Sequence, residues 1–155
     1  MPHIHEKVDF TVEVFIVYKN KILLRMHDKH KIWLSIGGHI ELNEDPVEAA
    51  IREVKEEVGL DIKLIGPKQP ASNNELDYKS IVGSHYIGVH QVNDVHRHVV
   101  FVYFAKTNTD VISESTMEHE RTETRWVTRE ELKKMNLRPN VLFYAEEALK
   151  KLGEK

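Results

Sequence analysis

The sequence predicts an α/β fold in which a mixed β-sheet lies between helices, an α/β/α sandwich. Segments rich in Val, Ile, Phe and Thr stand on both sides of a well-marked helical segment, a second helical segment lies near the C-terminus, and no repeat or linker interrupts the 155 residues. Strands and helices in this order pack as a sheet covered on two faces. The length suits one domain over residues 1–155.

Strands are expected first. Residues 8–18 alternate partly between apolar and polar side chains, and residues 22–26 would return after a turn at 19–21. Residues 33–36 predict a short apolar strand that ends at the pair Gly37-Gly38. Because glycine adopts backbone conformations that are closed to other residues, we expect the chain to bend there.

The clearest helix is expected between Asp45 and Gly59. Asp45 is a suitable N-cap, Pro46 suits the first turn, and Gly59 suits the left-handed position after the last turn. An apolar stripe at helical spacing should pack on the sheet. It consists of Val47, Ala50, Ile51, Val54 and Val58.

The second half of the chain predicts further strands and two more helices. Residues 68–79, with Pro, Ser and Asn, predict a long surface loop. Thr128 opens a short helix with a capping-box pattern, and residues 138–152 predict a C-terminal helix. Strands are expected at residues 60–65, 81–92, 98–106 and 123–127.

Charge and composition exclude several classes of function. With 22 Lys+Arg against 25 Asp+Glu, the net charge of −3 leaves no broad basic surface for a nucleic-acid backbone. The absence of cysteine excludes disulfides and thiolate chemistry. No signal-peptide pattern opens the chain, and no apolar run is long enough for a membrane span. We expect a cytoplasmic protein without nucleic-acid or membrane partners; a homodimer stays open.

Three glutamates form the candidate catalytic cluster: Glu53, Glu56 and Glu57. At spacings of three and four residues they project from one side of the helix, apart from the apolar stripe. Like charges so placed cost about 0.2–0.5 kcal/mol per pair, and a divalent cation would reverse the sign. Carboxylates suit Mg²⁺, or Mn²⁺, shared with phosphates. Taken alone, such a run is more often a solvated face, on which Arg52 pairs with Glu48 and Glu56.

The segment from Gly38 to Leu60 resembles the Nudix box. The matching positions are Gly38, Glu44, Arg52, Glu53, Val54, Glu56, Glu57, Gly59 and Leu60, at the spacing of that motif. Residues 125–128 and 130–132 also resemble the flanking pattern of the family, so the likeness spans most of the chain. One departure is Ile36, where many members have proline before the glycine pair.

The resemblance implies the Nudix fold and hydrolysis of a pyrophosphate bond in a nucleoside diphosphate linked to another moiety, with water as the nucleophile. It also implies Glu53, Glu56 and Glu57 as metal ligands, together with the Gly37 carbonyl. The substrate would be a nucleoside triphosphate, a dinucleoside polyphosphate or a nucleotide sugar. The alternative is a non-catalytic Nudix-like domain that binds and senses a nucleotide, against which the intact set of acids argues.

Arg52 resembles the box arginine that orients the glutamates, and Glu44 resembles the glutamate that ties the loop to the helix start. A plain N-terminal helix charge is the equal alternative for Glu44. The general base stays open between Glu53, Glu56 and Glu120. Glu120 lies in an acidic loop where some members have a further metal-binding acid.

Three side chains are candidates for substrate binding. Arg25 and His39 lie near the glycine pair and could contact phosphate. Tyr78 resembles the tyrosine of dinucleoside polyphosphate hydrolases. Four further histidines show no convincing metal spacing on any one element and are expected to be incidental: His85, His90, His96 and His98.

Overall fold

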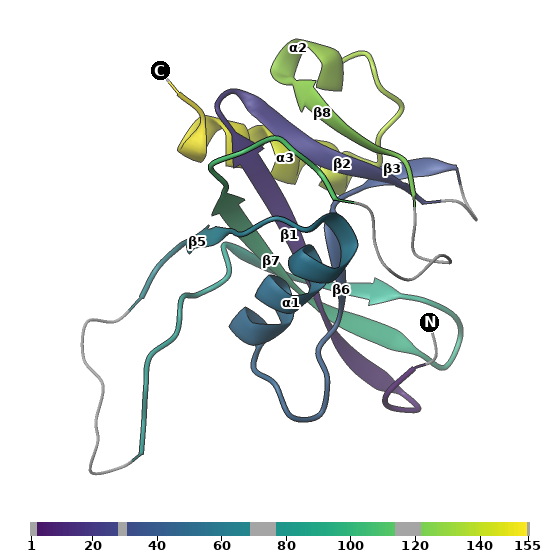
Figure 1. Cartoon of the computed structure of the whole chain (residues 1–155). Helices are drawn as coiled ribbons and strands as arrows, with labels where there is room; N and C mark the ends of the chain where they lie inside the picture. Colours follow the sequence, from purple (N-terminus) through teal and green to yellow (C-terminus); the bar gives the residue numbers. More distant parts are fainter. Residues whose placement is uncertain (1–2, 28–30, 69–76, 114–121, 155) are drawn as a thin grey trace.

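The computed structural model describes residues 3–27, 31–68, 77–113 and 122–154 (Figure 1). A mixed sheet contains eight strands, in the order β3-β2-β1-β7-β5, with β4 also paired to β1, β6 to β7 and β8 to β2. The elements are β1 (Val8–Tyr18), β2 (Lys21–His27), β3 (Ile32–Leu34), β4 (Ile36–His39), α1 (Pro46–Val58), β5 (Lys63–Ile65), β6 (Tyr86–Gln91), β7 (Arg97–Lys106), β8 (Thr124–Thr128), α2 (Arg129–Leu132) and α3 (Pro139–Leu152).

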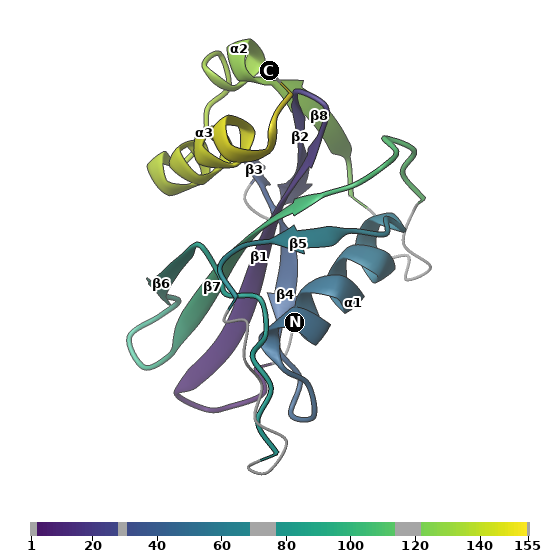
Figure 2. The same ribbon diagram turned by 90° about the vertical axis from the view of Figure 1, so that its left-hand side faces the viewer.

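Strand β1 is the centre of this sheet. It pairs in parallel with β7 from Val8↔Arg97 to Val17↔Lys106, and antiparallel with β2 and β4. Its alternation buries two sets of side chains, because neighbouring strand residues point to opposite faces. One set packs under α1 and the other under α3. These two helices lie on opposite sides of the sheet (Figure 2). The predicted mixed sheet between helices is therefore confirmed.

The expected bend at the glycine pair was wrong. Gly37 and Gly38 lie inside β4, paired with Glu13 and Val12, and Gly59 alone among the described glycines has a positive φ. The predicted strand 33–36 instead divides at Ser35 into β3 and β4. The glycines are needed for space: a Cβ on Gly37 would lie 2.0 Å from the Val12 carbonyl oxygen.

Other differences are smaller. Strand β5 begins at Lys63 rather than at residue 60, and β6 begins at Tyr86 rather than at 81. In α2 the Thr128 hydroxyl accepts a hydrogen bond from the Glu131 N–H, as a cap does, while the Glu131 carboxylate pairs with Arg125. Within the described residues, no helix has the length and apolar character needed to span a membrane.

Candidate active site

Helix α1 is fixed at both ends by the residues that the sequence indicates. The Asp45 carboxylate accepts from the Glu48 N–H at 2.9 Å, and the Glu48 carboxylate accepts from the Asp45 N–H at 3.1 Å, a complete capping box. Gly59 ends the helix in the left-handed region at φ 70°. These caps fix where the helix begins and ends.

The buried face of α1 includes two of the three glutamates. Glu53 is 6% exposed and the Glu57 side chain 7%, whereas the Glu56 side chain is 52% exposed. Successive helix residues turn by about 100°, so Glu56 stands outside the contact that holds Glu57. The prediction that the acids lie apart from the buried face was wrong for Glu53 and Glu57 and correct for Glu56. Ile51, predicted to be core, is 47% exposed.

Gly38 explains how Glu53 fits beneath the helix. A Cβ at Gly38 would lie 2.3 Å from Glu53 Oε1 and 2.8 Å from its Oε2. The carboxylate thus rests directly on the backbone of β4. Only glycine leaves this space. A sequence pattern alone does not reveal that the space is needed.

Glu57 has its two oxygens in different surroundings. Oε1 lies 3.5 Å from Arg25 Nη1, whereas Oε2 is buried without a hydrogen-bond partner among the described residues. Burial raises the pKa of Glu57 to about 8, with the neighbouring Glu53 adding to the increase and Arg25 opposing it. Burial also raises the pKa of Glu53, against the effect of Arg52. Two buried carboxylates side by side destabilise the folded protein unless a proton or a cation lies between them.

Arg52 connects the glutamates to the loop before α1. Its Nε and Nη2 donate to the two oxygens of Glu44 at 2.9 and 2.6 Å, and Nη2 also donates to the His39 carbonyl at 3.0 Å. Its Nη1 donates to Glu53 at 3.1 Å and to Glu56 at 3.2 Å. The hydrogen bonds from Arg52 hold the pKa of Glu44 below its usual value. Of the two pairings that the sequence suggested for Arg52, the one with Glu56 is present. The one with Glu48 is not found among the described residues, and the Glu48 carboxylate completes the capping box instead.

The remaining predicted site residues have different positions. Arg25 contacts Glu57, and its contact with phosphate stays a prediction. The His39 ring lies on the face opposite Gly38, with Nε2 3.1 Å from Asp9 Oδ2, which argues against its expected phosphate contact. Tyr78 is 52% exposed, and its substrate contact stays a prediction. Glu120 lies outside the described residues.

The structure also brings together a group that sequence reasoning missed. His3, Asp9, His96 and His98 offer ligand atoms within 4.8 Å of one another. The sequence contains one available signal, the His96-x-His98 spacing, which places two side chains on the same side of an extended chain. The pairing of Asp9 with His98 depends on the parallel register of β1 and β7, which no local pattern reveals.

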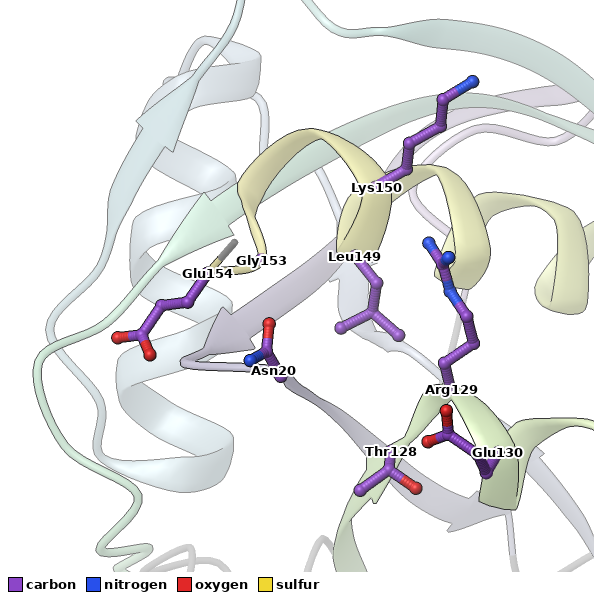
Figure 3. A pocket seen from close by; sticks show the side chains of 8 residues that line it. All are labelled: Asn20, Thr128, Arg129, Glu130, Leu149, Lys150, Gly153 and Glu154. Atoms are coloured by element: carbon purple, nitrogen blue, oxygen red, sulfur yellow. The ribbon is translucent and has the colours of Figure 1, made fainter.

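Two surface hollows lie at opposite ends of the fold. A hollow of about 300 Å³ borders Glu44, and Phe10, Phe101 and Ile40 are among its lining residues. A larger hollow of about 490 Å³ lies between the β1–β2 turn, α2 and the end of α3 (Figure 3). No predicted site residue lines the larger hollow, so its size alone does not make it the reaction centre.

Comparison with known proteins places the chain in a family. It matches the NUDIX domain over residues 9–146. A hydrolase of the NUDIX family from Clostridium perfringens has a TM-score of 0.80 and 39% identity, covering 93% of this chain and 97% of that one. The E. coli ORF135 protein has the same fold, with a TM-score of 0.63 and 19% identity, covering 94% and 91%.

A curated relative matches over a shorter stretch. The m7GpppN-mRNA hydrolase NUDT17 of Xenopus laevis is 39% identical over 64 residues, which is 37% of this chain. The match spans 22%, about a fifth, of the length of that relative. The domain match covers most of the chain, and the Clostridium perfringens structure agrees with it over almost the full length of both proteins. The chain therefore belongs to the Nudix hydrolase family.

Proposed function

We propose that this protein hydrolyses a pyrophosphate bond in a nucleoside diphosphate linked to another moiety, and that the reaction depends on Mg²⁺. The observation that supports this most directly is the buried pair Glu53 and Glu57, with Glu57 Oε2 lacking a partner among the described residues. A carboxylate left in this state is costly in a folded protein. A divalent cation would supply the missing partner.

The donor set fits Mg²⁺. Carboxylate oxygens are hard ligands, and few protein ligands leave positions for water and phosphate. We assign Glu53 and Glu57 to hold the ion, with Glu56 and the Gly37 carbonyl as further proposed ligands. When bound, Mg²⁺ neutralises diphosphate charge and makes a water molecule more acidic.

The residues of the chain have separate proposed roles. Arg52 keeps Glu53 and Glu56 in place through its two bonds at 3.1 and 3.2 Å. Glu56, whose side chain is 52% exposed, is more open to water than Glu53, which is 6% exposed, and is our preferred base; Glu53 and Glu120 stay alternatives. Arg25 lies beside Glu57 and, once a cation relieves that pairing, would be free to contact a phosphate oxygen.

The substrate class remains the one that the family suggests: nucleoside triphosphates, dinucleoside polyphosphates and nucleotide sugars. These share a chain of phosphoanhydride bonds joined to a nucleoside. We therefore propose a small-molecule nucleotide substrate rather than a nucleic acid, consistent with the net charge of −3.

The test is a panel of such nucleotides assayed with Mg²⁺ and with Mn²⁺, measuring release of a mononucleotide. We expect turnover of at least one member. Glu57→Gln should reduce kcat/KM by more than the roughly 10–100-fold that is typical when a residue that only orients a metal ligand is lost. Glu147→Gln on α3 is the matched control and should retain activity.

A second measurement separates catalysis from simple binding. Nucleotide and Mg²⁺ binding are measured by calorimetry on the same variants. Nucleotide binding without turnover of any panel member, with either cation, would support a sensor domain and overturn the proposed reaction.

A further inference from the structure

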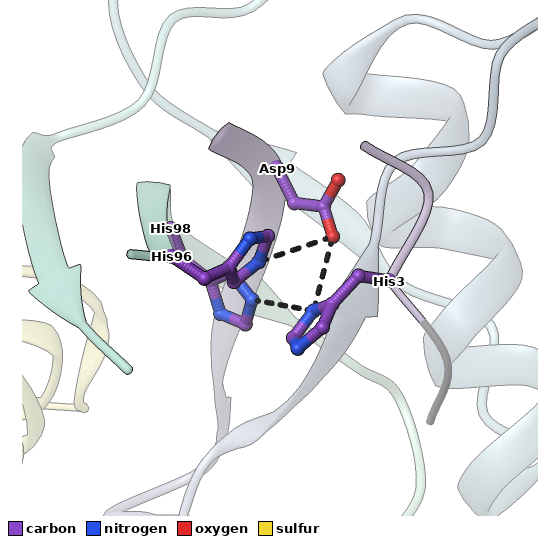
Figure 4. Close-up of side chains that lie close together, drawn as sticks. All are labelled: His3, Asp9, His96 and His98. Carbon is purple, nitrogen blue, oxygen red and sulfur yellow. Dashed lines mark hydrogen bonds and ion pairs between the residues drawn. The ribbon is translucent and has the colours of Figure 1, made fainter. Parts of the chain in front are cut away.

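Four side chains from three segments converge beside the N-terminal end of β1, and we call them the histidine cluster. They are His3, Asp9, His96 and His98 (Figure 4). His3 comes from the segment before β1, Asp9 from β1, His96 from the residue before β7 and His98 from β7. All four side chains point toward one another in Figure 4.

The distances in the histidine cluster are those of a metal site. Asp9 Oδ2 lies 3.3 Å from His3 Nδ1 and 3.5 Å from His96 Nε2, and His98 Nε2 lies 3.5 Å from His3 Nδ1. A tetrahedral Zn²⁺ with bonds of about 2.0–2.1 Å places its ligand atoms about 3.4 Å apart. The other pairs lie within 4.8 Å, and the side chain of His3 is 39% exposed.

His96 is oriented as a metal ligand would be. Its Nδ1 lies 2.9 Å from the Glu6 carbonyl oxygen, which can only accept, so Nδ1 carries the proton. Nε2 of the neutral ring then presents a lone pair toward Asp9. That atom is buried, in a residue 2% exposed, and lacks a hydrogen-bond partner among the described residues. A ring nitrogen that donates to a backbone carbonyl, and so leaves the other ring nitrogen free to bind an ion, is the usual arrangement of a histidine metal ligand.

Asp9 is also oriented as a metal ligand would be. It is 0% exposed, and its carboxylate accepts from the backbone N–H groups of Ile4 and His5, which fixes its orientation. Although burial acts to raise the pKa of Asp9, these hydrogen bonds and the nearby His39 and His96 hold it below its usual value. The carboxylate is thus kept charged in the interior, where a cation would be its natural counterpart.

The histidine cluster is separate from the carboxylates of α1. Asp9 pairs with His98 in the β1–β7 register, and both lie on the sheet face opposite that of Val12 and Val14, which pack under α1. Glu53 and Glu57 are on the α1 side. A single ion therefore does not serve both groups.

We propose that His3, Asp9, His96 and His98 bind one Zn²⁺ ion, which joins the N-terminal segment to β1 and β7. Three imidazole nitrogens and one carboxylate oxygen suit Zn²⁺ and related transition metals, whereas Mg²⁺ prefers oxygen ligands alone. Four ligands from the protein complete a tetrahedron, so the ion has a structural role. His39, with Nε2 3.1 Å from Asp9 Oδ2, lies beside the site and would help to position Asp9.

The test uses the tag-free full chain, stripped with EDTA and then titrated with ZnCl₂ in competition with a chromogenic chelator. We expect one Zn²⁺ per chain and a higher Tm with zinc than without. CoCl₂ should produce the visible absorption bands of a tetrahedral Co²⁺ site. Both His96→Gln and His98→Gln should weaken zinc binding at least about tenfold and remove the Tm shift.

Two controls make the result specific. His90→Gln changes an exposed histidine whose ring centroid is 6.2 Å from that of His98 but which is not in the histidine cluster, and it should keep full zinc affinity. The double variant Glu53→Gln/Glu57→Gln should also keep it. Circular dichroism of zinc-free His98→Gln shows whether that variant is folded, and Asp9→Asn is the second test of the same site.

The proposal fails if the wild-type chain binds no zinc at a stoichiometry near one. It also fails if folded His96→Gln and His98→Gln retain the affinity of the wild type, or if loss of Glu53 and Glu57 abolishes binding. None of these results depends on whether the protein hydrolyses a nucleotide.

Discussion

The two glycines of β4 allow one backbone atom and one carboxylate to come unusually close. At Gly37 an added methyl group would meet the Val12 carbonyl oxygen at 2.0 Å, and this oxygen belongs to the central strand and cannot move independently. At Gly38 the nearest atoms all belong to the Glu53 carboxylate, which is the end of a flexible side chain. The two neighbouring positions therefore require glycine for different physical reasons.

This difference predicts different results for two alanine variants. Gly37→Ala should lower the free energy of unfolding by about 1–3 kcal/mol, as overpacking typically does. Gly38→Ala should fold with a smaller loss of stability but displace Glu53, and so weaken Mg²⁺ binding and hydrolysis. Urea unfolding and Mg²⁺ titration of both variants check this. Equal stability of the two variants would contradict the assignment.

The proposed Mg²⁺ site depends on helix α1. The N-terminal cap of this helix can be changed without altering Glu53, Glu56 or Glu57. Asp45→Ala removes the bond at 2.9 Å to the Glu48 N–H and should cost about 0.5–2 kcal/mol of stability. Because the cap holds the first turn of the helix that carries the glutamates, Mg²⁺ affinity should fall as well. Thermal unfolding and calorimetry measure the two effects.

The control for that element is Asp61→Ala. The side chain of Asp61 is 93% exposed and pairs with Lys55 at 3.0 Å, so its loss should change stability by less than about 0.5 kcal/mol. If Asp61→Ala and Asp45→Ala were equally destabilising, the capping box would not be the cause.

The free energy of unfolding of the whole molecule should depend on the protonation of the Glu13 carboxyl group. This residue lies on β1, on the face turned toward α3 and Tyr144, because its neighbours Val12 and Val14 pack under α1. Burial raises the pKa of Glu13 above its ordinary value of 4.5. Above about pH 4.5 the folded protein therefore holds a proton that the unfolded chain has released.

The free energy of unfolding should consequently decrease as the pH rises from about 4.5 through the raised pKa of Glu13. Glu13→Gln should lose its share of this decrease, and the exposed Glu41→Gln should not. Urea unfolding at about pH 5 and about pH 8 measures the slope. Glu57 contributes equally in both variants, so the difference isolates Glu13. An unchanged slope in Glu13→Gln would contradict the prediction.

Local signals in the sequence were sufficient for most elements of the fold. Asp45, Pro46 and Gly59 predicted the ends of α1, and alternation predicted the full extent of β1. These signals work because a cap or an apolar period acts between residues that are near in sequence. The spacing of the acids also identified the family to which the chain belongs, a prediction that the domain match confirms.

The rotation of α1 against the sheet was decided only by packing. The apolar stripe suggested that Ile51 is buried and the acids exposed, yet Ile51 is 47% exposed and Glu53 is 6% exposed. Gly38 leaves room for a carboxylate beneath the helix, so the helix can turn its acids inward. Sequence periodicity is a property of the helix alone, whereas the space for the carboxylate is left by β4. Periodicity therefore cannot predict which side of the helix faces the sheet.

The sequence by itself thus determined the order of the elements, the ends of α1 and the set of acidic residues. The tertiary structure alone decided which acids are buried and which histidines meet. His96 and Glu6 are joined across 90 residues by a single hydrogen bond. The parallel pairing of β1 with β7 brings Asp9 beside His98 in the same way. Such neighbours arise from the register of distant strands, which is fixed by burial over the whole sheet rather than by any short pattern of residues.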